Sequence, residues 1–522
     1  MSGTVIAFLM LYYVIVLGIG YWAMRHGGSK DLEGYLLGGR QVGPMATALT
    51  LQSTSMSGYM FLGAGGLGYT QGYWAIWFAA GDIGGGVLNL SSIGRRMRKL
   101  SQMFGALTSI EYLEKRYPSP AVRLFAGVLT VFLLGFYVLA QLIAGGKGMA
   151  LVTGLPYPIA LAIAVGIILV YTFMGGYLAV AYTDFFQSLV MLVGVLWIAA
   201  AALSHVGGLT AANNAIAEFD PTLLSIWGKD LGFEGQWGVA AGAVLIFSIG
   251  LLGWPHVVTR HMAMSRPATA RKAGMWATAW NLLFVPTPYL VGILAVLILP
   301  ELNDPEMAIF EVAGLLLPPA VTGLVMAAIM AAIMSTADSL LLQTGSIASR
   351  DLYERFINPD ASERQMVMVS RGLVLAIALT GYVVALYEPP TVFAIVIFAT
   401  SVLGSAFLPA YFCAVWWKKA NTAGALSSMV VGASVAFGWE VAGMVESTQM
   451  APMTAGVASS ITTMIVVSLL TQKLSPVPAH IHQVMDEAAT VGPIPEALLA
   501  ASDTALGPEA SAIESKLNNS NG

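Results

Sequence analysis

Long apolar stretches separated by short polar segments form the main pattern of this 522-residue chain. A helix needs about 20 mostly apolar residues to cross a bilayer, and the chain has thirteen stretches of about that length. They lie near residues 4–24, 44–68, 72–93, 121–146, 156–175, 182–205, 235–258, 273–299, 313–346, 368–387, 391–416, 422–443 and 452–471. The pattern therefore predicts an all-α integral membrane protein with about 13 transmembrane helices.

The composition agrees with this class. Hydrophobic residues make up 57% of the chain and charged residues only 10%, whereas soluble proteins carry about 25% charged residues. The mean hydropathy is +0.75. The bilayer is therefore the expected surrounding, and the net charge of −4 gives no reason to expect nucleic acid as a partner. A single cysteine, Cys413, excludes an intramolecular disulfide and a multi-cysteine metal site.

Basic residues fall between alternate apolar stretches. With the N-terminus outside, of the 24 Lys and Arg residues only Lys147 and Lys229 lie at or beyond the outer face, and the segment from Arg260 to Lys272 is a cytoplasmic loop. The outer loops are acidic instead, with Glu218, Asp220, Glu301, Asp304 and Glu306. The positive-inside rule thus predicts a multi-pass cell-membrane protein (inner or plasma membrane) with the N-terminus outside.

Residues 474–522 differ from the rest of the chain, because the apolar runs stop there. The segment HIHQVMDEAA is expected to form a short helix, and the remainder a flexible cytoplasmic tail.

Two of the apolar stretches contain signals for an interrupted helix. The stretch MATALTLQSTSMSGYMFLGAGGLGY has small and polar residues at its centre, from Gln52 to Gly58, and GAVLIFSIGLLGWPHVVTR contains Pro255. Proline removes a backbone donor and kinks a helix; small residues alone could instead mark tight helix packing. Interrupted helices at corresponding places in two halves point to an inverted-repeat transporter with a site at the midplane.

The stretch IMAAIMSTADSLLLQTG, residues 329–345, places polar oxygens at membrane depth. Its polar members share an arc of about 160° on one helix face; they are Ser335, Thr336, Asp338 and Ser339. The Ala332 carbonyl can point the same way. Oxygen ligands suit a small hard cation. Asp184, near the start of the sixth stretch, is equally compatible with a helix cap and an ion ligand.

Lone amides and histidines complete the polar inventory. For Gln141, Gln187, Gln343 and Asn281, an interhelical hydrogen bond is the favoured role of each taken singly. All six histidines fall at span ends or in the tail: His26, His205, His256, His261, His480 and His482. This leaves no constellation for an enzyme embedded in the membrane, and we expect none.

Several motifs together resemble the sodium:solute symporter family. They are LLGGR at 36–40, STSMSGYMFLG at 53–63, FMGGYLAVAYTDFFQ at 173–187, GWPHVVTRHMA at 253–263, AAIMSTADSLLL at 331–342 and SRDLY at 349–353. The resemblance implies a LeuT-type core of two inverted five-helix repeats, 44–205 and 235–416. A first helix at 1–30 and two further helices at 422–471 would flank it, and a monomer would be the functional unit.

The family resemblance also implies the ion sites. It assigns a first co-transported sodium ion to carbonyls of Ser53 and Met56, the Ala332 carbonyl, and the hydroxyls of Ser335 and Thr336. A possible second sodium site involves Asp184 with Ser335 and Ser339. Family members with that site have a hydroxyl where this chain has Asp338, so a carboxylate there would strengthen or alter the site.

The resemblance is weaker for the substrate. Proline-transporting members have an aspartate at the position of Ser55, and a tryptophan and a tyrosine where Phe247 and Leu251 align, which argues against proline. Sialic-acid members have an arginine where Phe136 aligns, which argues against sialic acid. The stretches from GWPHVVTR to STADSLLLQ are more similar to pantothenate and monocarboxylate members.

The expected function is sodium-coupled import of a small organic solute by alternating access. The solute would be a carboxylate such as a monocarboxylate, pantothenate or an amino acid. The candidate substrate contacts are Gln52, Ser57, Tyr59, Gln141 and Phe247. A proton-coupled symporter of the same fold and a transporter-like solute sensor are the alternatives; a sensor would need a signalling domain, for which residues 474–522 are too few.

Overall fold

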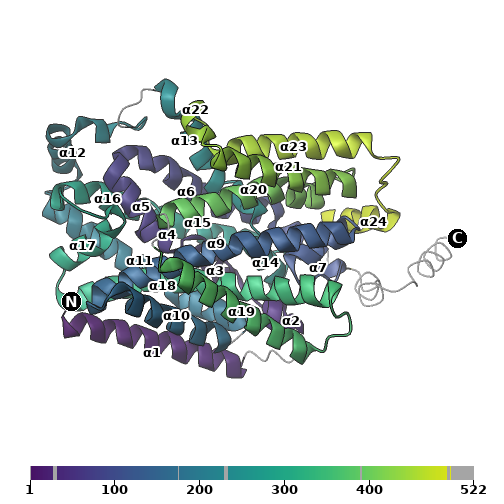
Figure 1. Ribbon diagram of the computed structural model, residues 1–522, viewed down its shortest axis with the longest axis horizontal. Helices are drawn as coiled ribbons and strands as arrows, with labels where there is room; N and C mark the ends of the chain where they lie inside the picture. Colours follow the sequence, from purple (N-terminus) through teal and green to yellow (C-terminus); the bar gives the residue numbers. More distant parts are fainter. Residues whose placement is uncertain are drawn as a thin grey trace.

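A computed structural model describes residues 2–26, 32–174, 176–228, 233–387, 391–490 and residue 494. The regular structure in these ranges is helical, as predicted. Most long helices run along the longest axis of the molecule, with α1 (Gly3–His26) along one face and α21 (Thr422–Val441) and α23 (Pro452–Leu470) along the opposite face (Figure 1).

Nine helical stretches of the described residues are long and apolar enough to cross a bilayer. Besides α1, α21 and α23 they are α9 (Pro120–Thr153), α11 (Tyr177–His205), α15 (Thr269–Phe284) with α16 (Pro286–Ile298), α18 (Pro319–Ile347) with η7 (Ala348–Glu354), α19 (Glu363–Ala385) and α20 (Val392–Trp416). Each of the nine coincides with one of the thirteen predicted spans.

The other four predicted spans consist of shorter helices. Two are α10 (Tyr157–Met174) and α6 (Ile76–Asn89), the latter preceded by η2 (Gly72–Ala75). The remaining two are interrupted, into α3 (Pro44–Ser55), α4 (Gly58–Phe61) and α5 (Gly63–Gln71), and into α13 (Phe233–Phe247), η5 (Gly250–Gly253) and α14 (Pro255–Ala263). Both predicted interruptions are therefore present. The division into two repeats stays a prediction.

Short helices join the spans or lie at their ends. They are α2 (Leu32–Leu37), η1 (Gly38–Arg40), η3 (Leu90–Gly94), α7 (Arg95–Met103), α8 (Ser109–Arg116), α12 (Leu209–Phe219), η4 (Pro221–Leu224), η6 (Pro305–Met307), α17 (Ala308–Leu316), α22 (Met444–Thr448) and α24 (Ala479–Ala489). Helix α24 confirms the short helix expected in the tail. The tail beyond residue 494 and the predicted outer Lys229 lie outside the described residues.

Helix α18 forms the centre of the bundle. It packs against α1, α3, α9 and α11, and every residue from 325 to 349 is buried. A helix that is covered on all sides can be apolar all round, and its polar side chains then face protein instead of lipid. The polar patch of α18 consequently lies inside the protein.

Charge is separated between the two ends of the bundle. In Figure 1, α12 and α17 lie at the end where α1 begins, and α7 and α24 lie at the opposite end. At the first end, Lys147 is held by Asp304 and Glu306, with Nζ–O distances of 2.8 and 2.9 Å. The arginine-rich helix α7 lies at the other end. This separation agrees with the charge pattern expected from the sequence.

An ion-pair network near α8 connects it to the end of α18. The buried carboxylate of Glu111 lies 3.2 Å from Lys115 Nζ and 3.3 Å from Arg350 Nη2. Burial by itself raises the pKa of Glu111, but Lys115, Arg350 and Arg123 outweigh it and lower that pKa to about 2. This carboxylate is therefore ionised at neutral pH and binds α8 to η7.

Candidate functional site

The first interrupted helix leaves backbone groups free at the centre of the bundle. Helix α3 ends at Ser55, and Met56 has φ −91° and ψ 69°, outside the helical range. Ser57 then caps the N-terminus of α4, and its hydroxyl accepts a hydrogen bond from the Tyr59 N–H at 3.2 Å. Carbonyls in the last turn of a helix have no partner within that helix, so the end of α3 can offer them to a ligand.

The second interruption has the proline at its predicted place. Trp254 is extended, with φ −92° and ψ 112°, and Pro255 is the first residue of α14. Proline is favoured at this position because the first turn needs no N–H from it. The chain between α13 and α14 passes through the short helix η5.

Hydroxyls of α18 meet the free carbonyls of α3. Ser335 Oγ lies 3.1 Å from Ser53 O and 3.2 Å from Ala332 O, and Thr336 Oγ1 lies 3.3 Å from Ser53 O and 3.1 Å from Thr54 O. All of these residues are buried. Four of the five residues assigned to the first sodium site are thus brought together, and Met56 is buried at the break itself. The Thr54 carbonyl was not expected to take part.

Asp184 of α11 lies in a neighbouring cluster of hydroxyls. Its Oδ2 accepts hydrogen bonds from Thr50 Oγ1 at 2.5 Å, Thr54 Oγ1 at 3.4 Å and Ser339 Oγ at 3.4 Å. Its Oδ1 is buried and has no hydrogen-bond partner among the described residues. Asp184 and Ser339, both assigned to the second sodium site, therefore meet, and Thr50 and Thr54 join them. This side chain does not cap the start of its own helix.

Asp338 is oriented differently from Ser339. Its Oδ1 accepts a hydrogen bond from the Ser339 N–H at 2.6 Å, so the carboxylate is bound to the backbone of its own helix. The sequence predicted that the polar residues of α18 share one helix face. Ser335, Thr336 and Ser339 agree with this prediction, because they contact α3 and α11.

Arg260 corrects the sequence-based interpretation most clearly. It was expected in a cytoplasmic loop, but it lies in α14 with only 3% of its side chain exposed. Its guanidinium donates to Thr50 O at 3.2 Å, to His256 O at 2.6 Å, to Ser339 Oγ at 2.8 Å and to Thr54 Oγ1. The loop assignment failed because the break lets α14 begin at Pro255 and pack against α3, α7 and α8.

The guanidinium lies where a second cation was expected. Arg260 Nη2 is 3.8 Å from Asp184 Oδ2 and contacts the Thr54 and Ser339 hydroxyls that also contact this carboxylate. In this structure, therefore, the charge of Asp184 is balanced by an arginine of the protein. His256 and His261 of the same helix are also fully buried.

Aromatic rings pack against Tyr59, which follows the break. Tyr59 stacks on Phe247, with ring centroids 5.0 Å apart and an interplanar angle of 12°. Phe393 lies 6.0 Å from the Tyr59 ring, and Phe78 packs edge-on against both Phe247 and Phe393. The two candidate substrate contacts Tyr59 and Phe247 thus form part of one aromatic wall.

A buried carboxylate that sequence reasoning missed lies beside this wall. Asp82 of α6 is 1% exposed, and its Oδ2 accepts a hydrogen bond from Tyr59 Oη at 3.2 Å. Tyr59 Oη also contacts Tyr289 Oη, while Asp82 Oδ1 has no hydrogen-bond partner among the described residues. The available signal was a lone acidic residue in the apolar stretch WFAAGDIGGG.

The polar candidates around the break are connected to neighbouring helices. Gln141 Oε1 accepts from the Gly58 N–H at 2.9 Å, while its Nε2 has no partner among the described residues. Ser57 Oγ accepts from Tyr137 Oη at 3.3 Å. Gln52 donates to Asn281 Oδ1, and Asn281 Nδ2 donates to the Asp82 carbonyl at 2.8 Å.

These contacts bear on the roles predicted for the lone amides. Interhelical hydrogen bonds are confirmed for Gln141 and Asn281, and also for Gln187, whose Nε2 donates to Tyr12 Oη at 2.9 Å. Binding of substrate by Gln141 stays a prediction, for which its Nε2 is available.

Sequence comparison identifies relatives over most of the chain. The profile of the sodium:solute symporter family matches residues 35–432. The chain is 30% identical over 494 residues to the osmoregulated proline transporter OpuE of Bacillus subtilis, covering 93% of this chain and 99% of that protein. It is 31% identical over 443 residues to a sodium/proline symporter of Staphylococcus aureus strain JH9, covering 83% and 85% of the two chains.

Solved structures show the same fold. A Na⁺-coupled sialic acid symporter in a substrate-bound outward-open state superposes with a TM-score of 0.73 at 17% identity, covering 90% of this chain and 98% of that one. Mhp1, a nucleobase-cation-symport-1 family transporter in a closed conformation, gives a TM-score of 0.54 at 18% identity, covering 87% and 98%. With a LeuT-type transporter fold established and the family profile matching residues 35–432, this multi-pass membrane protein belongs to the sodium:solute symporter family of secondary transporters.

Proposed function

We propose that this protein imports a small amino acid, proline above all, together with sodium. The observation that carries the proposal is the contact between the α3 carbonyls and the α18 hydroxyls at the buried break. Uncharged oxygen ligands suit a monovalent cation, which must bind and then leave. In transporters, ion and substrate sites are typically formed where irregular backbone lines a cavity at membrane depth.

The substrate preference changes from carboxylates in general to an amino acid. The relatives named above are described as proline transporters, which goes against the leaning toward pantothenate and monocarboxylate members. Asp82 supports the change, because it lies beside the aromatic Tyr59–Phe247 pair and its Oδ1 accepts no hydrogen bond from the residues that the structure describes. A cationic ammonium group would pair with this carboxylate, and an apolar ring would pack on the aromatic wall. If Asp82 supplies the carboxylate in this way, the serine at position 55, where proline-transporting members have an aspartate, no longer argues against proline as the substrate.

The proposed cycle uses sodium to fix the two helices at the break. Sodium bound by Ser53, Ala332, Ser335 and Thr336, with Met56 nearby, would hold α3 against α18 and stabilise the substrate site. Substrate would then permit closure, and loss of sodium to a sodium-poor cytoplasm would open the site inward. Each charge that moves across 100 mV supplies about 2.3 kcal/mol. The N-terminus is outside in this proposal, and a monomer is the functional unit.

Uptake by proteoliposomes tests the proposal. With an inward sodium gradient at fixed pH, labelled proline should accumulate, and replacing sodium by potassium should abolish the accumulation. Excess unlabelled pantothenate or lactate should not compete. Accumulation that follows a pH gradient and ignores sodium would favour the proton-coupled alternative, for which buried Asp82 and Asp184 offer carriers. Binding of proline with no uptake under any gradient would favour the sensor.

A further inference from the structure

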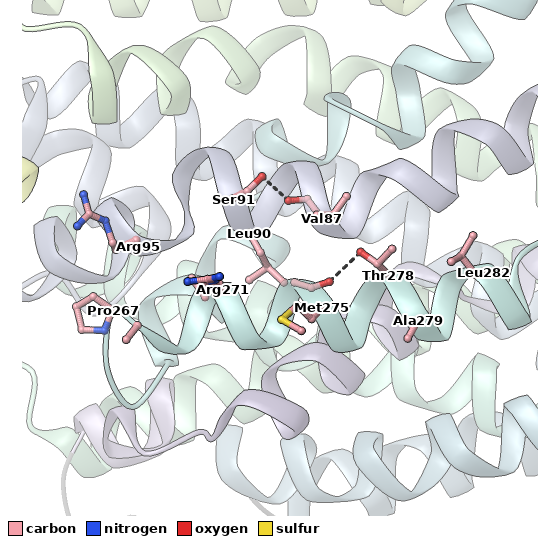
Figure 2. Close-up of a pocket in the computed structure, with 13 residues that line it drawn as sticks. Val87, Leu90, Ser91, Arg95, Pro267, Arg271, Met275, Thr278, Ala279 and Leu282 are labelled. Atoms are coloured by element: carbon pink, nitrogen blue, oxygen red, sulfur yellow. Dashed lines mark hydrogen bonds between the residues drawn. The ribbon is translucent and has the colours of Figure 1, made fainter. Parts of the chain in front are cut away.

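A groove outside the transport site runs along the surface of the bundle. It lies between α15 and the segment formed by α6, η3 and α7, and has a volume of about 900 Å³ (Figure 2). None of the residues that line it is a candidate ion or substrate contact. Its apolar lining includes Val87, Leu90, Met275 and Leu282, of which Met275 and Leu282 are 67% and 57% exposed.

The groove has one charged end and one apolar end. Arg95 and Arg271 project from different helices toward the end of the groove that Pro267 lines, and Leu282 lies at the other end (Figure 2). Neither arginine has a carboxylate within ion-pair distance among the described residues; Arg95 donates only to the carbonyls of Ala489 and Thr490, both at 3.4 Å. Two cationic groups that have no anionic partner in the described part of the chain therefore flank one end of the apolar groove.

The position of the groove matches one leaflet of a bilayer. The helix rise of 1.5 Å per residue gives about 16 Å between Arg271 and Leu282, which is close to half of the roughly 30 Å hydrocarbon core. Nearby Arg96 stacks on Trp416, with its guanidinium carbon 3.8 Å from the ring centroid. Tryptophan is typical of the membrane interface, and arginine of the cytoplasmic segments that adjoin it. This pattern would place the charged end of the groove at headgroup level and the apolar end within the hydrocarbon.

We propose that this groove binds an anionic phospholipid. Arg95 and Arg271 hold the headgroup phosphate, and an acyl chain lies along Leu90, Met275 and Leu282. Basic pockets between transmembrane helices are known to bind acidic headgroups. Because the groove contacts both α15 and the basic helix α7, a bound lipid fills the space between them.

Binding is tested with the full-length protein in nanodiscs of phosphatidylglycerol and phosphatidylcholine in equal amounts. Native mass spectrometry should find phosphatidylglycerol retained in preference to phosphatidylcholine. Arg95→Gln and Arg271→Gln should each lower the affinity about fivefold, and the double variant about thirtyfold. Lys272→Gln is the matched control, since it removes the same charge from the next position of α15, outside the groove lining, and should leave the preference unchanged.

A photo-crosslinking residue at Met275 identifies the occupant. A phosphatidylglycerol adduct at this site supports the proposal. An adduct with the chain's own segment after Thr490 would overturn it, because that acidic segment is the other candidate for the two arginines. An equal loss of preference in Lys272→Gln would also overturn it, since binding would then reflect surface charge in general. None of these measurements depends on transport activity.

Discussion

The arginine beside Asp184 gives the sharpest prediction for ion coupling. Replacing Arg260 by methionine keeps a long side chain but removes the cation from a cluster in which Asp184 is fully buried. The carboxylate then has no compensating charge within ion-pair distance among the described residues. We expect the variant to be unstable without sodium and to acquire a second sodium requirement.

The size of the effect follows from the observed distance. Two unit charges 3.8 Å apart interact by about 4 kcal/mol at an effective dielectric constant of about 20. Loss of one partner of a buried pair typically costs about 3–5 kcal/mol, which is the expected drop in the free energy of unfolding. Sodium entering the vacated site would recover about 2.7 kcal/mol at a concentration one hundred times its Kd.

The assay is thermal unfolding in nanodiscs, titrated with sodium against a constant-osmolarity potassium background. The free energy of unfolding of the wild type should rise with ln[Na⁺] at a limiting slope of RT, as for one bound ion, because the guanidinium occupies the second position; the slope for Arg260→Met should approach 2RT. Arg364→Met, which removes an exposed arginine, is the control. The Asp184→Asn, Arg260→Met double variant should lose the second sodium response and be more stable than the sum of the single variants predicts, by about 3 kcal/mol.

Three outcomes would refute this reasoning. A wild-type slope of 2RT would mean that Arg260 and a second sodium ion coexist. An unchanged sodium response in Arg260→Met would mean that the vacated position does not bind sodium. Additive effects in the double variant would mean that Asp184 and Arg260 do not interact energetically.

Three further predictions concern the ion site, the substrate site and pH. Replacing Ser335 and Thr336 together by alanine should raise the sodium concentration for half-maximal uptake at least about tenfold, since each hydrogen bond to a charged group contributes about 1.5–3 kcal/mol. The control Ser346→Ala, which removes a hydroxyl that donates to the Leu342 carbonyl of its own helix, should leave that concentration unchanged. Equal effects of the two replacements would argue against the site. Asp82→Asn should reduce proline uptake at least about tenfold but leave the rise of the melting temperature with sodium unchanged. Loss of both proline uptake and this sodium-dependent rise would indicate a structural role for Asp82. The pKa of Glu111 is lowered from 4.5 to about 2, so the stabilising effect of this carboxylate is complete above pH 4.5 and is lost as the pH falls toward 2. The melting temperature of Glu111→Gln should therefore depend less on acid pH than that of the wild type. Identical pH profiles of the two proteins would contradict the ionised state assigned to Glu111.

The spans and interruptions could be predicted from the sequence because they depend on local properties. Whether a stretch partitions into lipid is decided by its own residues, so nine predicted spans recur as single helical stretches and four as shorter helices. A proline acts on its own backbone, and Pro255 accordingly begins a new helix after a break. The convergence of Ser335 and Thr336 with Ser53 was predictable only with the family resemblance, which relates two distant stretches of chain.

The partners of the charged groups were decided by tertiary structure alone. Arg260 looks like a loop residue in sequence because the apolar stretch before it ends nearby. The packing of α14 against α3 nevertheless surrounds it with oxygen atoms from two other helices, α3 and α18. Asp82 likewise has no polar neighbour in sequence, and its hydrogen bond comes from Tyr59 across the interrupted helix. The sequence by itself determined which segments enter the membrane and where they break, since these depend on neighbours along the chain. Only the fold decided which charges face each other, since that depends on neighbours in space.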